Sequence, residues 1–227
     1  MHKRILGTVT IGQAPRDDVA PIIERHVPPG TRLIHRGALD GYTRAEIAAE
    51  FAPDPGEAAL ITRLHDGGSI HLSRRRMREA VQQTIHHLEA DGCDVILVLC
   101  TGTFIGLETR RAWLVEPDHI IPAVAAGLIE HRQLGIIVPI AGQIVSEAEK
   151  WQHLAHPPLF ATASPYAADG EQLSDAGQTL HARGAQAILL DCIGFTERHR
   201  AELTPLGVPV ILSNAVVAKA VGELLEG

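Results

Sequence analysis

The chain has few aromatic residues, few cysteines and no long apolar run, and each shortage excludes a class of protein. Aromatic residues make up 4% of the 227 positions although 45% are hydrophobic, so a core must be built mainly from Ile, Leu, Val and Ala. Three cysteines do not form the disulfide framework of a small secreted domain. No apolar stretch reaches the length of about 18 residues that a membrane span requires. We therefore expect a cytoplasmic protein with reduced thiols and no membrane partner.

An excess of positive charge is also missing. The 20 Lys and Arg residues face 27 Asp and Glu residues, which gives a net charge of -7 with histidines neutral. This balance argues against a general nucleic-acid surface. The 13 histidines form no zinc-like cluster, since His86 and His87 are adjacent and point to different helix faces. We expect no metal, no cofactor and no nucleic-acid partner, and a homo-oligomer remains possible from the sequence.

What the chain does contain is an internal repeat around two of its cysteines. Residues 92–102 align without a gap with residues 184–194, and this pairs the opening glycines, an Ile-Leu step, and Cys100 with Cys192. The repeat extends upstream, because Leu6-Gly7 and Leu134-Gly135 each open an apolar run. The sequence therefore predicts two pseudo-symmetric halves.

Short aliphatic runs alternate with longer periodic stretches, a pattern typical of parallel α/β proteins. The expected strands are 5–11, 32–35, 94–99, 134–139, 158–161, 187–191 and 209–212. The expected helices are 17–25, 43–50, 73–91, 121–131, 143–154, 174–183 and 215–225. We predict two Rossmann/flavodoxin-like lobes with parallel sheets, whose strand carboxyl ends meet at a shared cleft. The first lobe is expected to hold residues 1–131 and 209–227, and the second lobe residues 132–208.

Helix ends and one insertion complete this outline. Gly92 and Gly184 are expected to stop helices in the left-handed conformation, and Asn214 is expected to cap the last helix. Residues 37–69 make the first half much longer than the second. This segment is interpreted either as a lid or as an ordinary surface connection.

The two repeated cysteines are the candidate reactive groups. Cys100 precedes a Thr-Gly-Thr turn whose backbone N–H groups are expected to stabilise a thiolate and lower the thiol pKa from about 8.5. Asp191 directly precedes Cys192 and would raise the pKa of that thiol if its carboxylate points inward. The alternative is that both are small core residues, as we expect for Cys93.

Two further segments carry candidate ligand-binding residues. The loop after the first strand contains Gln13 and Arg16, and the Arg16 guanidinium is suited to a bidentate contact with a carboxylate. Ser73 is a plausible N-cap for a helix that begins with Arg74, which could reach an anionic ligand. The alternative for both arginines is a solvated position on the surface.

These motifs resemble the AroM protein family over essentially the full length. The matching segments are 10–13, 72–75, 94–97, 136–139, 190–200 and 212–214. The paired cysteines are also similar to those of the aspartate/glutamate racemase superfamily, which contains cofactor-independent racemases, maleate isomerases, hydantoin racemases and arylmalonate decarboxylases. This resemblance implies an aspartate/glutamate racemase-like fold in which Cys100 and Cys192 flank the reacting carbon. It also implies that the residues after Cys100 bind a carboxylate.

The chain departs from the racemases in ways that bear on its substrate. Where their second cysteine is usually followed by Thr and then His or Glu, this chain has Ile193-Gly194-Phe195, which supplies no hydroxyl and no acid or base. The acidic residue that many racemases place at the end of the first strand is also missing. These differences favour a substrate other than free aspartate or glutamate.

The function expected from the sequence is a cofactor-independent racemase, isomerase or related lyase that acts on a small carboxylate. The alternative is a non-catalytic protein that binds a small acid in the same cleft. Cys100 and Cys192 are the expected catalytic residues. The expected substrate-binding residues are Gln13, Arg16, Ser73, Arg74, Thr101, Gly102, Thr103, Pro139, Gly194, Phe195 and Asn214.

Overall fold

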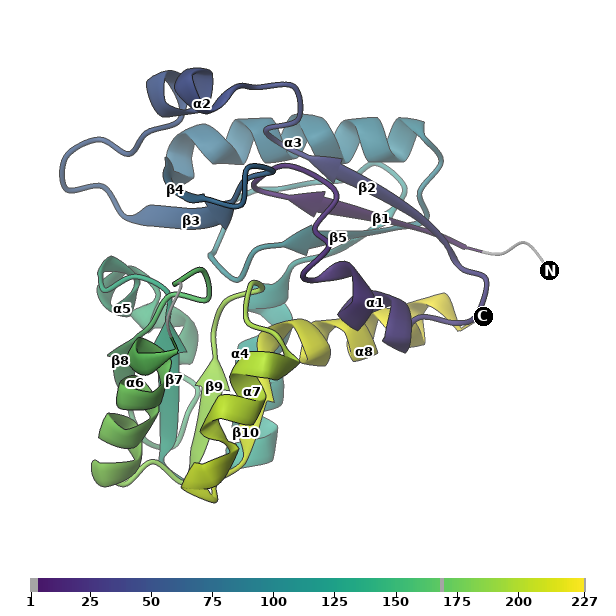
Figure 1. Ribbon diagram of the computed structural model, residues 1–227. Coiled ribbons are helices and arrows are strands. Elements are labelled where there is room, and N and C mark those ends of the chain that lie inside the picture. The colour runs from purple at the N-terminus through teal and green to yellow at the C-terminus, as the bar shows by residue number, and fades with distance from the viewer. Residues whose placement is uncertain (1–3, 168–169, 227) are drawn as a thin grey trace.

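A computed structural model describes residues 4–167 and 170–226, and it shows two α/β lobes, each built on a parallel sheet (Figure 1). The first sheet has the strand order β2-β1-β5-β6, and the second, followed from its opposite edge, has the order β8-β7-β9-β10. The strands are β1 (Ile5–Thr10), β2 (Arg32–Gly37), β5 (Val95–Leu99), β6 (Trp113–Val115), β7 (Leu134–Val138), β8 (Leu159–Thr162), β9 (Ala187–Leu190) and β10 (Val210–Leu212). The predicted fold class and its pseudo-symmetry are confirmed.

The repeat is visible in the packing as well as in the strand order. A Cβ atom added to Gly7 of β1 would lie 2.8 Å from Sγ of Cys93, and one added to Gly135 of β7 would lie 3.1 Å from Cβ of Ala185. Cys93 and Ala185 are partners in the sequence alignment. Both glycines therefore occupy the same close contact in their respective lobes, where a larger residue does not fit.

The last strand lies in a different lobe from the one expected. Residues 210–212 pair with residues 188–190 of β9, so β10 completes the second sheet and does not return to the first lobe. The first sheet has its own fourth strand, β6, which the sequence analysis did not predict. Only the final helix, α8 (Ser213–Leu225), reaches the first lobe, where it packs against α1 (Ala20–His26).

The helices cover the sheets and largely follow the periodic stretches of the sequence. They are α2 (Arg44–Glu50), α3 (Arg74–Ala90), α4 (Pro117–Ile129), α5 (Gly142–Ser146), α6 (Glu171–Ala182) and α7 (Glu197–Leu203), with 3-10 turns at Ala148–Trp151 and Thr204–Leu206. The predicted stops after α3 and α6 are confirmed, since Gly92 and Gly184 have φ of +86° and +95°. One helix was expected over 143–154, but α5 ends early and a 3-10 turn follows it.

Residues 37–69 contain most of an antiparallel hairpin that the sequence analysis did not resolve. Its strands are β3 (Ala59–Arg63) and β4 (Ser69–Ser73), joined by a turn at Gly67, whose φ is +83°. In Figure 1 the hairpin extends from the first lobe over the second. This position favours the interpretation as a lid.

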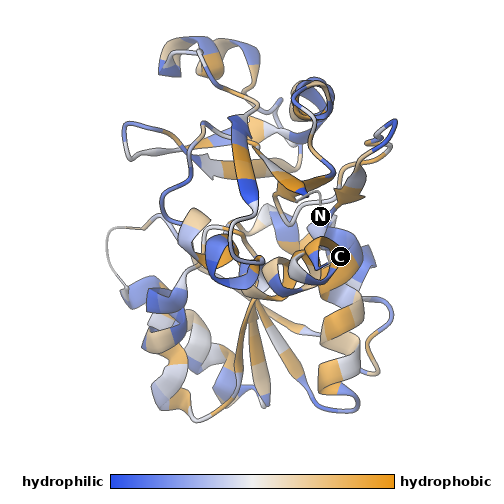
Figure 2. Cartoon of the chain, turned by 90° about the vertical axis from the view of Figure 1, so that its right-hand side faces the viewer, coloured by the Kyte–Doolittle hydropathy of each residue, from blue (hydrophilic) through white to orange (hydrophobic). Residues whose placement is uncertain are grey.

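A shared apolar core joins the lobes. Side chains on β5 alternate, so that Val95, Leu97 and Leu99 pack into a core with residues of β7, β9, α4 and α8, whereas Ile96 and Val98 pack under α3. In Figure 2 the strands are predominantly apolar, while polar residues lie on the outer helix faces. The two sheets are therefore held through one continuous core and not through a flexible linker.

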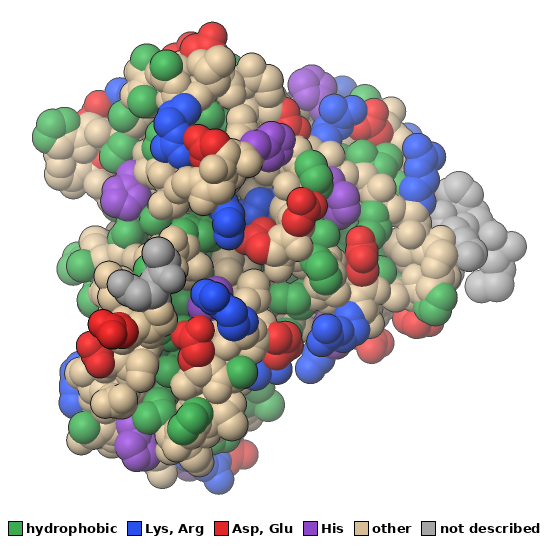
Figure 3. Space-filling model, in the orientation of Figure 1, with side chains coloured by type: hydrophobic (Ala, Val, Ile, Leu, Met, Phe, Trp, Pro, Cys, Tyr) green, Lys and Arg blue, Asp and Glu red, His purple; other side chains and the backbone are tan. Residues whose placement is uncertain are grey.

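Within the described residues, no helix is both long enough and apolar enough to cross a bilayer. The face shown in Figure 3 carries acidic and basic side chains interspersed with one another, so this face offers no extended field of one sign.

A pair of helix glycines tests the contact between α8 and α1. A Cβ on Gly222 would collide with the carbonyl oxygen of His26, whereas a Cβ on Gly127 of α4 would meet nothing. We expect Gly222→Ala to lower the free energy of unfolding by about 1–3 kcal/mol. Gly127→Ala should raise it by about 0.5–1 kcal/mol, because alanine favours the helix. Urea unfolding of both variants checks this, and equal stability of the two would contradict the close contact.

Candidate active site between the lobes

The two repeated cysteines line one cavity between the lobes. Cys100 directly follows β5, and Cys192 comes two residues after the end of β9. The same cavity is also lined by four other residues expected from the sequence, namely Arg16, Thr101, Gly102 and Pro139. Its volume is about 20 Å³, which is room for about one water molecule. The cavity is therefore closed around the thiols.

The β3 strand forms one wall of this cavity through Leu60, Ile61 and Thr62. The Thr62 hydroxyl is buried and has no hydrogen-bond partner among the described residues. A Cβ on Gly102 would lie 2.8 Å from Leu60, so glycine at this position lets the hairpin approach the Cys100 loop. The hairpin thus supplies both a cover and a free polar group.

Burial controls the protonation of both thiols. It raises the pKa of Cys100 to about 12, although the Gly102 N–H lies 3.4 Å from Sγ and acts in the opposite direction. It raises the pKa of Cys192 to about 11, against the lowering effects of the Gly194 N–H and Arg16. The turn after Cys100 was expected to lower the thiol pKa, and this is wrong for the closed cavity because desolvation outweighs the backbone hydrogen bond. The expected effect of Asp191 on Cys192 is present, since this carboxylate raises the pKa.

A buried lysine connects the loops that carry the two cysteines. Nζ of Lys150 lies 2.7 Å from a carboxylate oxygen of Asp191 and donates to the carbonyl oxygen of Thr101 at 3.0 Å. The Thr101 hydroxyl also donates to the carbonyl oxygen of Asp191 at 3.3 Å. Burial lowers the pKa of Lys150, but Asp191 and Glu147 outweigh it and leave the pKa raised. Lys150 therefore remains charged and ties the end of β5 to the end of β9.

Arg16 makes different contacts from those expected of a substrate clamp. Its Nε and Nη2 each donate to Asp18 at 2.8 Å, so an internal carboxylate already occupies the bidentate side of the guanidinium. Nη2 also donates to the hydroxyl of Tyr166 at 3.2 Å. Tyr166 lies in the loop after β8 and lines the same cavity as Cys192. Arg16 thus positions Tyr166 beside the thiols.

A wider groove lies beside the cavity and receives two more of the expected residues. Arg74 and Thr103 line this groove, which has a volume of about 780 Å³, and both contact Glu147. Lys150 lines it as well and donates to the carbonyl oxygen of Thr101, a residue that lines the cysteine cavity. Arg74 is therefore paired with a carboxylate of the opposite lobe.

The remaining expected residues support the site from outside the cavity. Gln13 joins the carbonyl of Tyr42 to the N–H of His65, and the Ser73 hydroxyl accepts from the N–H of Arg76 as the predicted cap of α3. Gly194 and Phe195 belong to the Cys192 loop, and Phe195 is fully buried.

Asn214 was expected to cap α8, but that helix begins at Ser213, which places Asn214 inside the first turn. Its amide instead donates to the carbonyls of Ile193 and Phe195 at 2.9 and 2.5 Å. The residue therefore fixes the loop that carries Cys192.

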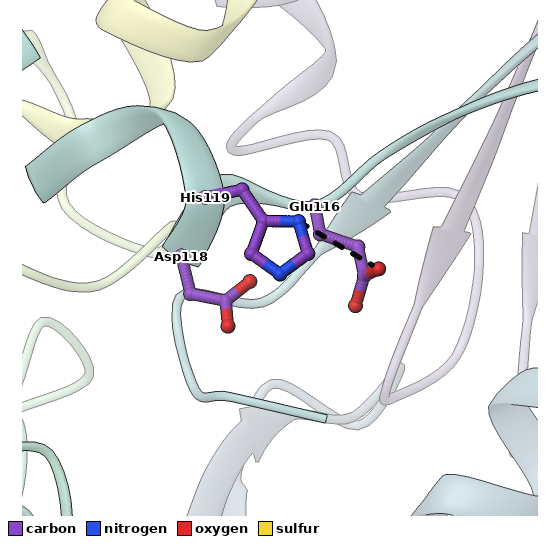
Figure 4. A group of neighbouring side chains, drawn as sticks. All are labelled: Glu116, Asp118 and His119. Carbon is purple, nitrogen blue, oxygen red and sulfur yellow. Dashed lines mark ion pairs between the residues drawn. The ribbon is translucent and has the colours of Figure 1, made fainter. Parts of the chain in front are cut away.

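One group of side chains has the donors for a divalent cation. Ligand atoms of Glu116, Asp118 and His119 lie within 4.8 Å of one another at the start of α4 (Figure 4). This group was not expected from the sequence, because its spacing matches none of the histidine and cysteine motifs of zinc sites. Asp118 and His119 line the wider groove and not the cysteine cavity. Acidic side chains are common in the first turn of helices, so the group by itself assigns no metal.

Comparison with known families now identifies the chain. The model of a family described as AroM protein matches residues 6–225. The chain belongs to the AroM family. A search of curated proteins finds no match.

Solved structures with the same fold include three enzymes. Glutamate racemase RacE1 from Bacillus anthracis superposes with a TM-score of 0.68 at 15% identity, covering 99% of this chain and 83% of that one. Allantoin racemase from Klebsiella pneumoniae gives 0.65 at 16% identity, covering 97% and 87%. An arylmalonate decarboxylase gives 0.60 at 15% identity, covering 98% and 93%. The fold of this AroM family member is therefore that of the aspartate/glutamate racemase-like proteins.

Four polar residues of the site were not expected from the sequence, namely Thr62, Gln143, Lys150 and Tyr166. None lies in the cysteine repeat, and each comes from a segment expected to be a surface connection, a helix or a loop. No motif marks any of them, although Lys150 is one of only three lysines in the sequence.

We expect Lys150→Met to lower the free energy of unfolding by about 3–5 kcal/mol, because the buried carboxylate of Asp191 would lose its cation. Adding Asp191→Asn should recover part of the loss. The matched control is Lys219→Met on the exposed face of α8, which should change stability by less than about 0.5 kcal/mol. Chemical denaturation at neutral pH measures all three, and similar values for both lysine variants would contradict the structural role of Lys150.

The raised thiol pKa values predict a loss of stability in alkali. Unfolded thiols ionise near pH 8.5, whereas Cys100 and Cys192 hold their protons to about 12 and about 11 when folded. The stability from these groups is therefore complete below the unfolded pKa and is lost as pH rises toward the folded values. Between about pH 8.5 and pH 10 the ionisation of each thiol in the unfolded chain should lower the free energy of unfolding by roughly 1.5 kcal/mol. Urea unfolding under reducing conditions should show a steeper decline for the wild type than for Cys100→Ala/Cys192→Ala, and parallel declines would refute this.

Proposed function

We propose that this chain is a cofactor-independent racemase or isomerase that moves a proton at a carbon next to a carboxylate. The observation that supports the proposal is the shared cavity of Cys100 and Cys192, which are equivalent residues of two pseudo-symmetric lobes. Two thiols that approach one carbon from opposite lobes can serve as base and acid on its two faces.

The reaction balances with the two thiols alone. One cysteine acts as a thiolate and takes the proton from carbon, so that a C–H bond breaks and an S–H bond forms. The opposite thiol then gives its proton to the other face of the carbon and becomes a thiolate. The enzyme is left with the same total charge and with the roles of the cysteines exchanged, ready for the reverse reaction.

The closed cavity sets the order of events. Its volume of about 20 Å³ excludes even a small acid, so substrate entry requires the β3–β4 hairpin or the lobes to move apart. Burial is the largest cause of both raised thiol pKa values, so opening lowers them and allows a thiolate to form. Closure around the substrate then raises the basicity of that thiolate at the reacting carbon.

The polar groups of the cavity suit a carboxylate. The unpartnered hydroxyl of Thr62 is an available donor beside the Cys100 loop, whose Gly102 N–H points at Sγ of Cys100. Among the structural neighbours, a glutamate racemase and an arylmalonate decarboxylase are named for carboxylate substrates. We therefore propose a small carboxylic acid as the ligand. The three free thiols fit a reducing compartment such as the cytoplasm.

A second candidate function is the binding of a small acid without turnover. It is favoured by the protonated state of both thiols and by the absence of an acid or base in Ile193-Gly194-Phe195. This alternative predicts thermal stabilisation by an acid that undergoes no chemical change.

The experiment is incubation of the protein in D₂O with a panel of amino, hydroxy and unsaturated carboxylic acids, followed by NMR. Deuterium at the α-carbon of one acid supports proton transfer and names its substrate class. A new product without α-exchange supports isomerase or lyase chemistry. Thermal stabilisation by an acid that shows neither change supports the binding protein.

For an acid that exchanges, we expect Cys100→Ala and Cys192→Ala each to reduce the rate by at least about a hundredfold, because each removes one of the two proton-transfer groups. The matched control is Cys93→Ala, since Cys93 is also buried but packs against Gly7 at the amino-terminal side of β5. Its rate should stay within about twofold of the wild type. Full activity in both Cys100→Ala and Cys192→Ala would rule out the two-thiol mechanism.

A further inference from the structure

The second lobe lacks a polar side chain directly after its cysteine, but the folded chain brings one there from elsewhere. Tyr166 follows β8, which is two strands away from β9 in sheet order, and it lines the cavity with Cys192. A Cβ on Gly194 would lie 2.5 Å from the Tyr166 hydroxyl oxygen. Gly194, two residues after Cys192, thus leaves the space that the tyrosine hydroxyl occupies.

Arg16 fixes the direction of the hydrogen bonds at this hydroxyl. The guanidinium has no acceptor, so its 3.2 Å contact must be donated to the hydroxyl oxygen of Tyr166. Asp18 holds the guanidinium from the other side, and the Arg16 side chain is only 6% exposed. The hydroxyl proton of Tyr166 is therefore available to a second acceptor, and Sγ of Cys192 is the reactive atom beside it.

The pKa shifts of the two thiols agree with a hydrogen bond from the Tyr166 hydroxyl to Cys192. Tyr166 and Arg16 both act to lower the pKa of Cys192. Each thiol also has a carboxylate that raises its pKa, Asp191 for Cys192 and Glu147 for Cys100, so the hydrogen bond from Tyr166 is what distinguishes Cys192. Burial raises the pKa of Tyr166, so its hydroxyl stays protonated and remains a donor over the whole working range.

We propose that Tyr166, held by Arg16, is a catalytic residue that donates its hydroxyl proton in a hydrogen bond to Sγ of Cys192 and so makes Cys192 the thiolate that starts the reaction. This assignment rests on the proposed two-thiol function. It also specifies an order, in which Cys192 is the thiolate when substrate binds and takes the proton from carbon, while Cys100 starts as the acid. Arg16 acts through Tyr166 and is a positioning residue.

The test measures each thiol separately and needs no substrate. In the Cys93→Ala/Cys100→Ala background the only thiol is that of Cys192, and in Cys93→Ala/Cys192→Ala it is that of Cys100. The iodoacetamide labelling rate as a function of pH gives the apparent pKa of each thiol. We expect Tyr166→Phe to raise the pKa of Cys192 by one to two units, which slows labelling at neutral pH by about tenfold or more. The pKa of Cys100 should shift by less than about half of that amount.

The matched control is Tyr42→Phe, which makes the same chemical change at the other tyrosine, where the ring packs edge-to-face on Phe51 away from the cavity. It should leave both thiols unchanged. Equal shifts of both thiols in Tyr166→Phe, or no shift of Cys192, would overturn the assignment.

An activity measurement separates this assignment from the proposed function. If an acid exchanges its α-proton, Tyr166→Phe should move the alkaline-rising limb of the pH–rate profile to higher pH, which a merely structural defect would not do. A selective shift of Cys192 in a protein that exchanges no acid would support the hydrogen bond while counting against the enzyme. If an acid exchanges its α-proton but Tyr166→Phe leaves the pKa of Cys192 unchanged, the enzymatic function is supported and the role of Tyr166 is overturned.

Discussion

The ammonium group of Lys150 holds the two halves of the site together. It is buried between the lobes, where it meets the carboxylate of Asp191 next to Cys192 and the carbonyl of Thr101 next to Cys100. Each lobe alone would present a strand end with a cysteine and nothing to fix its position relative to the other. One buried cation thus sets the relation between the thiols, and the apolar core that joins the sheets sets the relation between the lobes.

The same closure that aligns the thiols also suppresses their ionisation. Desolvation dominates the pKa of both cysteines, and hydrogen bonds from Gly102 and Gly194 only reduce its effect. The hairpin strand β3, with Leu60 against Gly102, forms one wall of the cavity that buries both thiols. Ligand access and thiol ionisation therefore both depend on the position of β3, because a movement that admits a ligand also hydrates the thiols and lowers their pKa.

The sequence predicted what depends on local pattern and on the repeat. Parallel strands and the helix stops at Gly92 and Gly184 follow from periodicity. That Cys100 and Cys192 would lie at one site was implied by the resemblance to the racemase superfamily, and the two residues do line one cavity. Contacts between distant segments could not be predicted in this way. The bidentate side of Arg16 is occupied by Asp18, Tyr166 comes from the loop after β8, and β10 pairs with β9 of the second sheet. A surface or loop position in the sequence says nothing about such partners until the fold is known.

The matched strand orders of the two sheets have a consequence for how such a chain could arise. Val95, Leu97 and Leu99 of one half and Leu134, Ile136 and Val138 of the other contribute to a single core. A precursor with one lobe would expose that apolar face and would need a second copy of itself to cover it. Joining two such copies in one gene turns the interface between subunits into the interior of one chain. The two halves can then acquire different substitutions and insertions. The β3–β4 hairpin follows β2 in the first half and has no counterpart among the described residues of the second half, so it is a feature that arose in one half alone.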